Sequence, residues 1–183
     1  MCPLCGQAGC WREIAPYERG VVELFPFREG TVPVARFQCR STGRTFSLLP
    51  WQLAPYHRYT VESMVLAVLV WRQVVAEGDG GVCAAVEELP GDAGVSPWLL
   101  RRWRGVLIAG LRLAHSVLRE RHDLEEIRSA DGRDGPGLLD EVHAYAVLIG
   151  GRDPPSRRGL REAVRRYGAT AGRHLVGRPS QER

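Results

Sequence analysis

The chain of 183 residues contains no lysine, so all 25 of its lysine-plus-arginine residues are arginines. It also lacks an apolar run of the roughly 20 residues that a membrane-spanning helix requires. An apolar run from Met64 to Trp71 is much shorter, lies between Glu62 and Arg72, and predicts a buried helix. The N-terminus has no charged segment followed by an apolar one, so no secretory signal is expected. We therefore expect a cytoplasmic protein with no membrane partner.

Cysteine is scarce, and its five copies are an odd number. Two of them have C-x2-C spacing, which favours thiolate chemistry in a reducing compartment over a disulfide framework. Cys83 falls in an apolar helical segment and is expected to be a small core residue. A hydrophobic content of 44% is enough for a core, while a net charge of +4 and a pI near 9.0 suit a polyanionic partner.

The clearest motif is residues 2–6, in which Cys2 and Cys5 flank a turn that ends in a glycine. Such a turn lets two thiolates converge on one zinc ion. A second segment, residues 36–47, has the same shape around Cys39, but Thr42 stands where its second cysteine would be. A neutral hydroxyl is a poor zinc ligand, so the ligand set is short by one.

Three accounts of the fourth ligand are open. In the first, Cys10 joins Cys2, Cys5 and Cys39. In the second, a water or His57 completes a three-cysteine site. In the third, zinc has been lost and packing alone holds the segment. The first is favoured, because three converging cysteines without a metal are liable to oxidation.

Between the two cysteine turns, the sequence predicts strands over residues 21–25 and 32–37, joined by a turn at residues 28–30. A third strand over residues 44–48 would complete a small antiparallel sheet. So small a sheet usually needs a metal or a neighbouring domain to stay folded.

Helices are predicted after a proline-containing linker. Thr60 can cap a helix from Val61 to about Ala76, and shorter helical segments follow at residues 82–89, 138–149 and 160–167. The fold class is therefore α+β, a zinc-ribbon-like sheet followed by a mainly helical bundle. The expected divisions are a ribbon-like domain at 1–49, a linker at 50–59, a helix-turn-helix bundle at 60–122, a flexible loop at 123–137, C-terminal helices at 138–167 and a disordered tail at 168–183.

The strongest helix start is Ser96, whose hydroxyl can cap the first turn, followed by Pro97 at a position that needs no N–H. Helical periodicity places Leu100, Trp103, Leu107 and Leu111 on one side and Trp98, Arg101, Arg102, Gly105 and Arg112 opposite. The short helical segment 82–89 and the turn at 90–94 precede it. These are the parts of a helix-turn-helix, whose second helix enters the DNA major groove.

Duplex DNA is therefore the expected partner. The residues expected to contact it are Ser96, Trp98, Arg101, Arg102 and Arg104 on this helix, Arg58 in the linker, and Arg40 and Arg44 on the ribbon.

Residues 2–6 and 36–47, followed by a helix-turn-helix, resemble the N-terminal zinc ribbon of bacterial transposases and their small companion proteins. The resemblance covers roughly residues 1–115. It implies zinc as a cofactor and either DNA or a transposase as a partner.

The sequence does not favour an enzyme. The acidic residues after the helix-turn-helix, Asp123, Asp131, Asp134, Asp140 and Glu141, lie in no strand pattern of the kind that a two-metal nuclease core needs. A non-enzymatic DNA-binding protein is expected. The alternatives are an adaptor that binds a transposase or itself, and a decayed transposase fragment, with which Thr42 is consistent.

Overall fold

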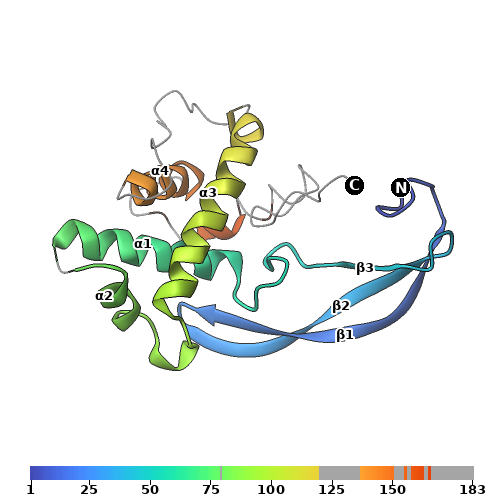
Figure 1. The fold of residues 1–183 in the computed structure, drawn as a ribbon, viewed down its shortest axis with the longest axis horizontal. Helices are drawn as coiled ribbons and strands as arrows, with labels where there is room; N and C mark the ends of the chain where they lie inside the picture. The colour runs from blue at the N-terminus through green and yellow to red at the C-terminus, as the bar shows by residue number, and fades with distance from the viewer. Residues whose placement is uncertain (79, 120–136, 151–154, 156–157, 163–164, 166–183) are drawn as a thin grey trace.

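The computed structural model describes residues 1–78, 80–119, 137–150, 155, 158–162 and 165. Its order of elements is β1 (Trp11–Leu24), β2 (Phe27–Cys39), β3 (Thr45–Leu48), α1 (Val61–Glu77), α2 (Val82–Glu87), the short 3-10 turn η1 (Gly91–Ala93), α3 (Pro97–Arg119) and α4 (Gly137–Gly150). The α+β class is confirmed, since a three-stranded antiparallel sheet precedes the helices (Figure 1).

The sheet is dominated by one long hairpin, which is longer than the sequence predicted. β1 and β2 pair from Trp11↔Cys39 to Leu24↔Phe27, so the closing turn is at residues 25–26. The turn predicted at residues 28–30 is wrong, because these residues pair with β1 and Gly30 faces Val21. Polar residues and a glycine suggested a turn there, but the ladder continues through them to the apolar pair Leu24 and Phe27.

The closed end of the hairpin enters the helical core. Val22 and Leu24 are buried in the same cluster as α1 and α3. The backbone N–H of Val22 donates to the carbonyl of Arg58 at 2.8 Å, and that of Leu24 donates to Oγ of Ser63 at 2.9 Å. The open end, which carries the cysteine turns, lies at the opposite end of the hairpin from α2 and α3 (Figure 1).

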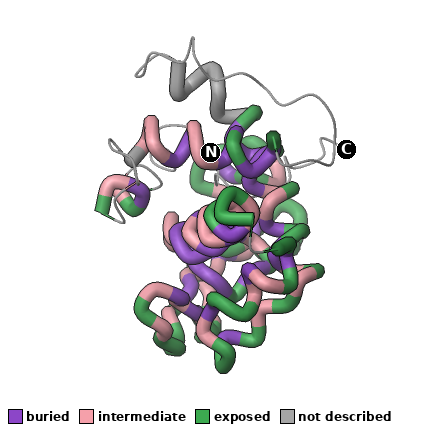
Figure 2. The backbone as a smooth tube through the Cα atoms, turned by 90° about the vertical axis from the view of Figure 1, so that its left-hand side faces the viewer, coloured by how far each residue is buried: buried purple, intermediate pink, exposed green. Residues whose placement is uncertain are grey.

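The helix α1 begins where its sequence predicts. Thr60 caps it by accepting a hydrogen bond from the Ser63 N–H, and Gly78 ends it in the left-handed region at φ 79°. Residues around most of its circumference are buried, because the hairpin, α2, α3 and α4 all pack against it. Buried positions of the helices gather toward the middle of the bundle (Figure 2).

The helix α3 also confirms its predicted start and its predicted apolar face. Oγ of Ser96 accepts from the Leu99 N–H at 3.2 Å. Leu100, Trp103 and Leu107 are wholly buried, and Leu111 is nearly so. The Trp103 ring meets the ring of Tyr59 edge-on, with centroids 4.7 Å apart. This face fixes the rotation of α3 about its axis, and thereby which residues point outward.

The short helix α2 corrects the prediction for Cys83. That residue is exposed, whereas Val82 and Ala85 are buried. A helix of six residues can bury only one narrow stripe, and Cys83 lies outside it.

The helix α4 lies against α1 and α3. Its range agrees with the predicted one, and the described residues 160–162 of the helix predicted at 160–167 are helical, with that helix beginning at residue 158. The loop predicted at 123–137, apart from its last residue, and the tail predicted at 168–183 lie outside the described residues.

Candidate metal centre and basic helix face

The two cysteine turns have matching geometry. In the first, the N–H of Gly6 donates to the Cys2 carbonyl at 2.9 Å, and Gly6 has φ 72°. In the second, the N–H of Gly43 donates to the Cys39 carbonyl at 2.8 Å, and Gly43 has φ 69°. Only glycine adopts this backbone conformation without strain. Thr42 therefore occupies the position that Cys5 has in the first turn.

Cys10 supplies the sulfur that the second turn lacks. It directly precedes β1, and its carbonyl accepts from the Arg40 N–H at 2.8 Å, which sets it beside the second turn. The ligand atoms of Cys2, Cys5, Cys10 and Cys39 all lie within 4.8 Å of one another. Of the three accounts of the fourth ligand, the structure brings together the set that contains Cys10.

The sulfur spacing fits zinc. A tetrahedral site with Zn–S bonds of about 2.3 Å has sulfurs about 3.8 Å apart. The Cys10 and Cys39 sulfurs are 3.8 Å apart, and those of Cys39 and Cys5 are 3.6 Å apart. The sulfurs of Cys5 and Cys10, at 3.0 Å, need only a small outward shift to complete the same tetrahedron. The four thiols are positioned to hold a metal ion compatible with zinc.

The surroundings favour thiolates at two of the four positions. A hydrogen bond from the Thr42 side chain, helped by the Thr42 backbone and opposed by burial, lowers the pKa of Cys39 to about 6. Burial raises the pKa of Cys2, but hydrogen bonds from the backbone of Leu4 and Cys5 outweigh it and leave that pKa lowered. The pKa of Cys10 is raised, chiefly by its hydrogen bonding with Cys5. Thiolates are the form that binds metal.

A small aromatic cluster supports this end of the sheet. The ring of Phe37 meets that of Trp11 edge-on at 5.0 Å and stacks on that of Phe46 at 5.4 Å. Trp11 is still 42% exposed, so this cluster is a thin layer and not a closed core. Such a layer is weak support on its own, which is the situation in which small domains depend on a metal.

His57 is not part of the cysteine cluster. It is buried at the helical end of the hairpin, where burial and the charges of Arg102 and Arg19 lower its pKa. Burial and nearby positive charge both disfavour the protonated form of its imidazole.

The outward face of α3 carries an aromatic and basic surface, made of Trp98, Arg101 and Arg102. Trp98 is 63% exposed, and the guanidinium of Arg102 lies 5.4 Å from the centre of its ring. Arg101 and Arg102 are exposed, and in the described part of the chain neither pairs with a carboxylate. Their charges therefore remain available to a ligand.

Two other arginines predicted to contact DNA have partners inside the protein. Arg104 is half-buried, with its guanidinium 5.0 Å from the ring centre of Trp71 on α1. Arg58 donates from Nη2 to the Ala93 carbonyl at 3.1 Å, in the turn before α3. The Tyr59 hydroxyl donates to the same carbonyl at 2.6 Å. Arg58 therefore fastens the turn that positions α3.

Arg40 and Arg44 lie at the other end of the molecule. Both are exposed and belong to the second cysteine turn. The 14 residues of β1 separate them from α3, which at about 3.3 Å per residue is roughly 45 Å. The sequence-predicted residues therefore form two groups, one at each end of the hairpin.

Sequence reasoning missed Arg19. Its Nη2 donates to the carbonyls of Ala54 and His57, at 2.9 and 2.7 Å, and so ties β1 to the linker. No local pattern could have indicated this contact, because the partners are separated by 35 and 38 positions in the sequence.

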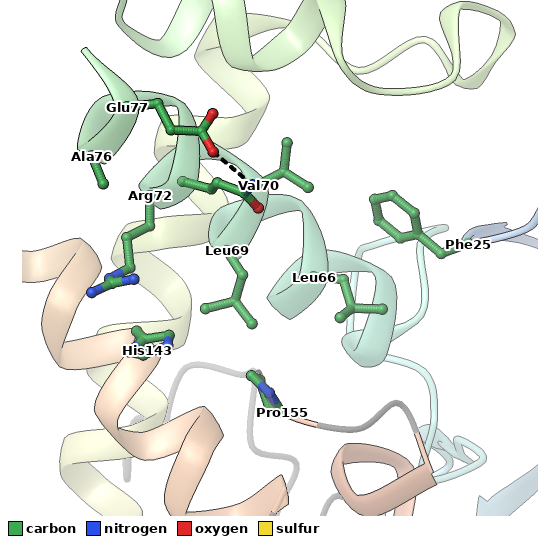
Figure 3. Close-up of a pocket in the computed structure, with 10 residues that line it drawn as sticks. Phe25, Leu66, Leu69, Val70, Arg72, Ala76, Glu77, His143 and Pro155 are labelled. Atoms are coloured by element: carbon green, nitrogen blue, oxygen red, sulfur yellow. Dashed lines mark hydrogen bonds between the residues drawn. The ribbon is translucent and has the colours of Figure 1, made fainter. Parts of the chain in front are cut away.

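An apolar groove of about 490 Å³ lies away from both groups (Figure 3). Leu66 and Leu69 of α1 face His143 of α4 and Pro155 across it, and Phe25 of the hairpin turn closes one end. Its polar rim includes a hydrogen bond of 2.8 Å from Gln73 to Glu77. The residues that line it include none of those predicted to bind metal or DNA.

None of the helices within the described residues combines the length and apolarity needed to cross a membrane. Comparison of the chain with protein families, with curated proteins and with solved structures finds no match. The resemblance to transposase N-terminal regions therefore depends on the cysteine turns and on the order of the elements alone.

Proposed function

We propose that this chain is a non-enzymatic DNA-binding protein that recognises duplex DNA with the first turns of α3. The observation that carries the proposal is the surface of Trp98, Arg101 and Arg102, which is exposed and has no carboxylate partner in the described structure. The helix beneath it is held rigidly, because Leu100, Trp103 and Leu107 are wholly buried. Rigid placement is what recognition of base edges requires.

The arrangement suits a major groove. The elements follow one another in the order α2, turn and α3, and the first turn of α3 faces outward. The start of the second helix is the part that a helix-turn-helix protein inserts into the DNA major groove. Arginine can donate two hydrogen bonds to guanine, a contact worth about 1–3 kcal/mol of discrimination. Ser96 and Trp98, at the helix start, would contact phosphate and sugar.

The metal would have a structural role. Cys2, Cys5, Cys10 and Cys39 would hold zinc, which would supply the cross-link that the thin aromatic layer around Phe37 lacks. Arg40 and Arg44 would then offer phosphate contacts at the opposite end of the hairpin from α3. The family that these features support is that of transposase-related zinc-ribbon proteins.

The test is titration of a labelled random-sequence duplex by fluorescence anisotropy at several salt concentrations. The Arg101→Ala, Arg102→Ala variant is expected to bind at least tenfold more weakly, with a shallower dependence on salt, because each lost phosphate contact lowers the slope by about 0.9. The control is Arg72→Ala, Arg165→Ala, which removes the same charge from residues paired with Asp140 and Glu162. Equal binding by the two variants would refute the proposal.

One observation favours a second candidate, a protein-interaction adaptor. Tryptophan and arginine are also the residues that the centres of protein–protein interfaces favour, and Trp98 and Arg102 form such an exposed pair. Sedimentation distinguishes the two functions. A stable dimer that Trp98→Ala converts to a monomer, without duplex binding by the wild type, would favour the adaptor.

A further inference from the structure

The linker contains a tight turn at residues 54–57 with an unexpected residue in it. The N–H of His57 donates to the Ala54 carbonyl at 3.2 Å, and Pro55 occupies the second position. Tyr56, at the third position, has φ 65°, and it is the one non-glycine residue of the described chain with a positive φ. This is the position of a type II turn that normally requires glycine. A tyrosine there is strained by its Cβ.

Packing does not explain the tyrosine. Its side chain is 96% exposed, so the ring gains almost nothing from burial. The neighbouring aromatic, Tyr59, is 4% exposed and forms part of the core. The two tyrosines of one short segment thus have opposite surroundings, and only Tyr56 lacks a structural reason for its identity.

The turn is held firmly in place. Arg19 donates to both of its end carbonyls, those of Ala54 and His57. Arg58, the residue after the turn, reaches the Ala93 carbonyl directly before α3. Tyr56 is therefore presented on a turn that Arg19 holds at both ends, two residues before Arg58, whose guanidinium contacts the turn that precedes α3.

We propose that Tyr56 is a second DNA contact, which packs its ring against the sugar–phosphate backbone that flanks the groove occupied by α3. The inference rests on the proposed function and adds to it a contact outside α3. A strained residue kept in a rigid, exposed position is typical of functional sites. An exposed aromatic ring on a turn held by Arg19 and followed by Arg58 suits an anionic ligand with an apolar sugar face. The contact carries no sequence information, so it raises affinity for any duplex equally.

The test combines thermal unfolding with anisotropy titration of a random 20-base-pair duplex. Tyr56→Gly removes both the ring and the strain. We expect its melting temperature to be unchanged or raised and its duplex affinity to fall about fivefold, which corresponds to ~1 kcal/mol. Tyr56→Phe keeps the ring and is expected to bind within twofold of the wild type. Tyr17→Ala, at another exposed tyrosine far along the hairpin, is the control and should bind as the wild type does.

Wild-type affinity in Tyr56→Gly would overturn the inference, and so would an equal loss in Tyr56→Phe. Either result, with binding still weakened by Arg101→Ala, Arg102→Ala, would leave the proposed function standing. Absence of duplex binding by the wild type would overturn both.

Discussion

Glu141 of α4 lies wholly inside the protein and accepts two hydrogen bonds from Arg112 of α3, one to each carboxylate oxygen, at 2.8 and 2.7 Å. The Arg112 side chain itself is 39% exposed. The pair is therefore asymmetric, with one charge that can reach water and one that cannot.

This asymmetry predicts unequal effects of removing either partner. Arg112→Ala takes two hydrogen bonds and a positive charge away from a buried carboxylate and should lower the free energy of unfolding by about 3 kcal/mol. Glu141→Gln leaves the cation able to turn toward solvent, so its effect should be clearly smaller. Urea unfolding of both variants measures the difference. A larger loss in Glu141→Gln would contradict the prediction.

The metal site predicts an exchange of ligands. Cys10→Ser should lose bound zinc, because three sulfurs remain and Thr42 cannot replace the fourth. Adding Thr42→Cys to Cys10→Ser puts a sulfur at the position equivalent to Cys5, and should restore one zinc per chain. Metal analysis of freshly purified protein is the measurement. Zinc retained in Cys10→Ser, or not regained in the double variant, would contradict the proposed ligand set.

The burial of His57 predicts a dependence of stability on pH. Its pKa in the folded protein is lowered by burial and by Arg102 and Arg19, so the unfolded chain takes up a proton first as the pH falls. The contribution of His57 is complete above its ordinary pKa of about 6.5 and is lost as the pH falls through the lowered value. Urea unfolding at pH 8, 7, 6 and 5.5 should show this decline, and His57→Gln should flatten it. An equal decline in the variant would assign the effect to other groups.

Ser96 allows its capping role to be separated from its proposed DNA contact. Ser96→Ala removes the acceptor for the Leu99 N–H and should cost about 1 kcal/mol of stability. Ser96→Asp keeps a good cap, so its stability should match the wild type, but its added charge should repel phosphate and weaken duplex binding. Thermal unfolding and anisotropy on the same samples test both expectations. Unaltered duplex binding by Ser96→Asp would place Ser96 outside the interface.

The helix starts were predictable because their signals are local. Thr60 and Ser96 accept hydrogen bonds from backbone groups three residues later, so each start is determined within one turn of chain. The amphipathic pattern of α3 was equally sufficient to separate Trp98 from Trp103. The cluster of four cysteines was one of three accounts that the sequence left open, and it was favoured because converging cysteines without a metal are liable to oxidation.

The remaining features depend on contacts between distant residues. The hairpin turn was misplaced because Gly30 looked like a turn residue, whereas pairing with Val21 keeps it within a strand. The roles of Arg58 and Arg104 depend on Ala93 and Trp71, and the sequence does not reveal such partners. Thus the sequence predicted which arginines could contact DNA. Only the structure separated Arg101 and Arg102, which pair with no carboxylate in the described chain, from the arginines that hold the fold together.

The length of the hairpin has a consequence for how the protein loses structure. Between the aromatic layer at Phe37 and the buried Val22, Val34 is the one buried residue of β1 and β2, so this stretch has little core of its own and depends largely on its anchors at both ends. If zinc fills the cysteine cluster as proposed, its removal by a chelator should start fraying at Cys39 that advances toward Val22, so that hydrogen exchange quickens in a gradient along β2. Hydrogen exchange in the helices would be the last to change. Loss of the metal would thus shorten the ordered part of the hairpin and leave α3, at the other end of the hairpin, unaltered.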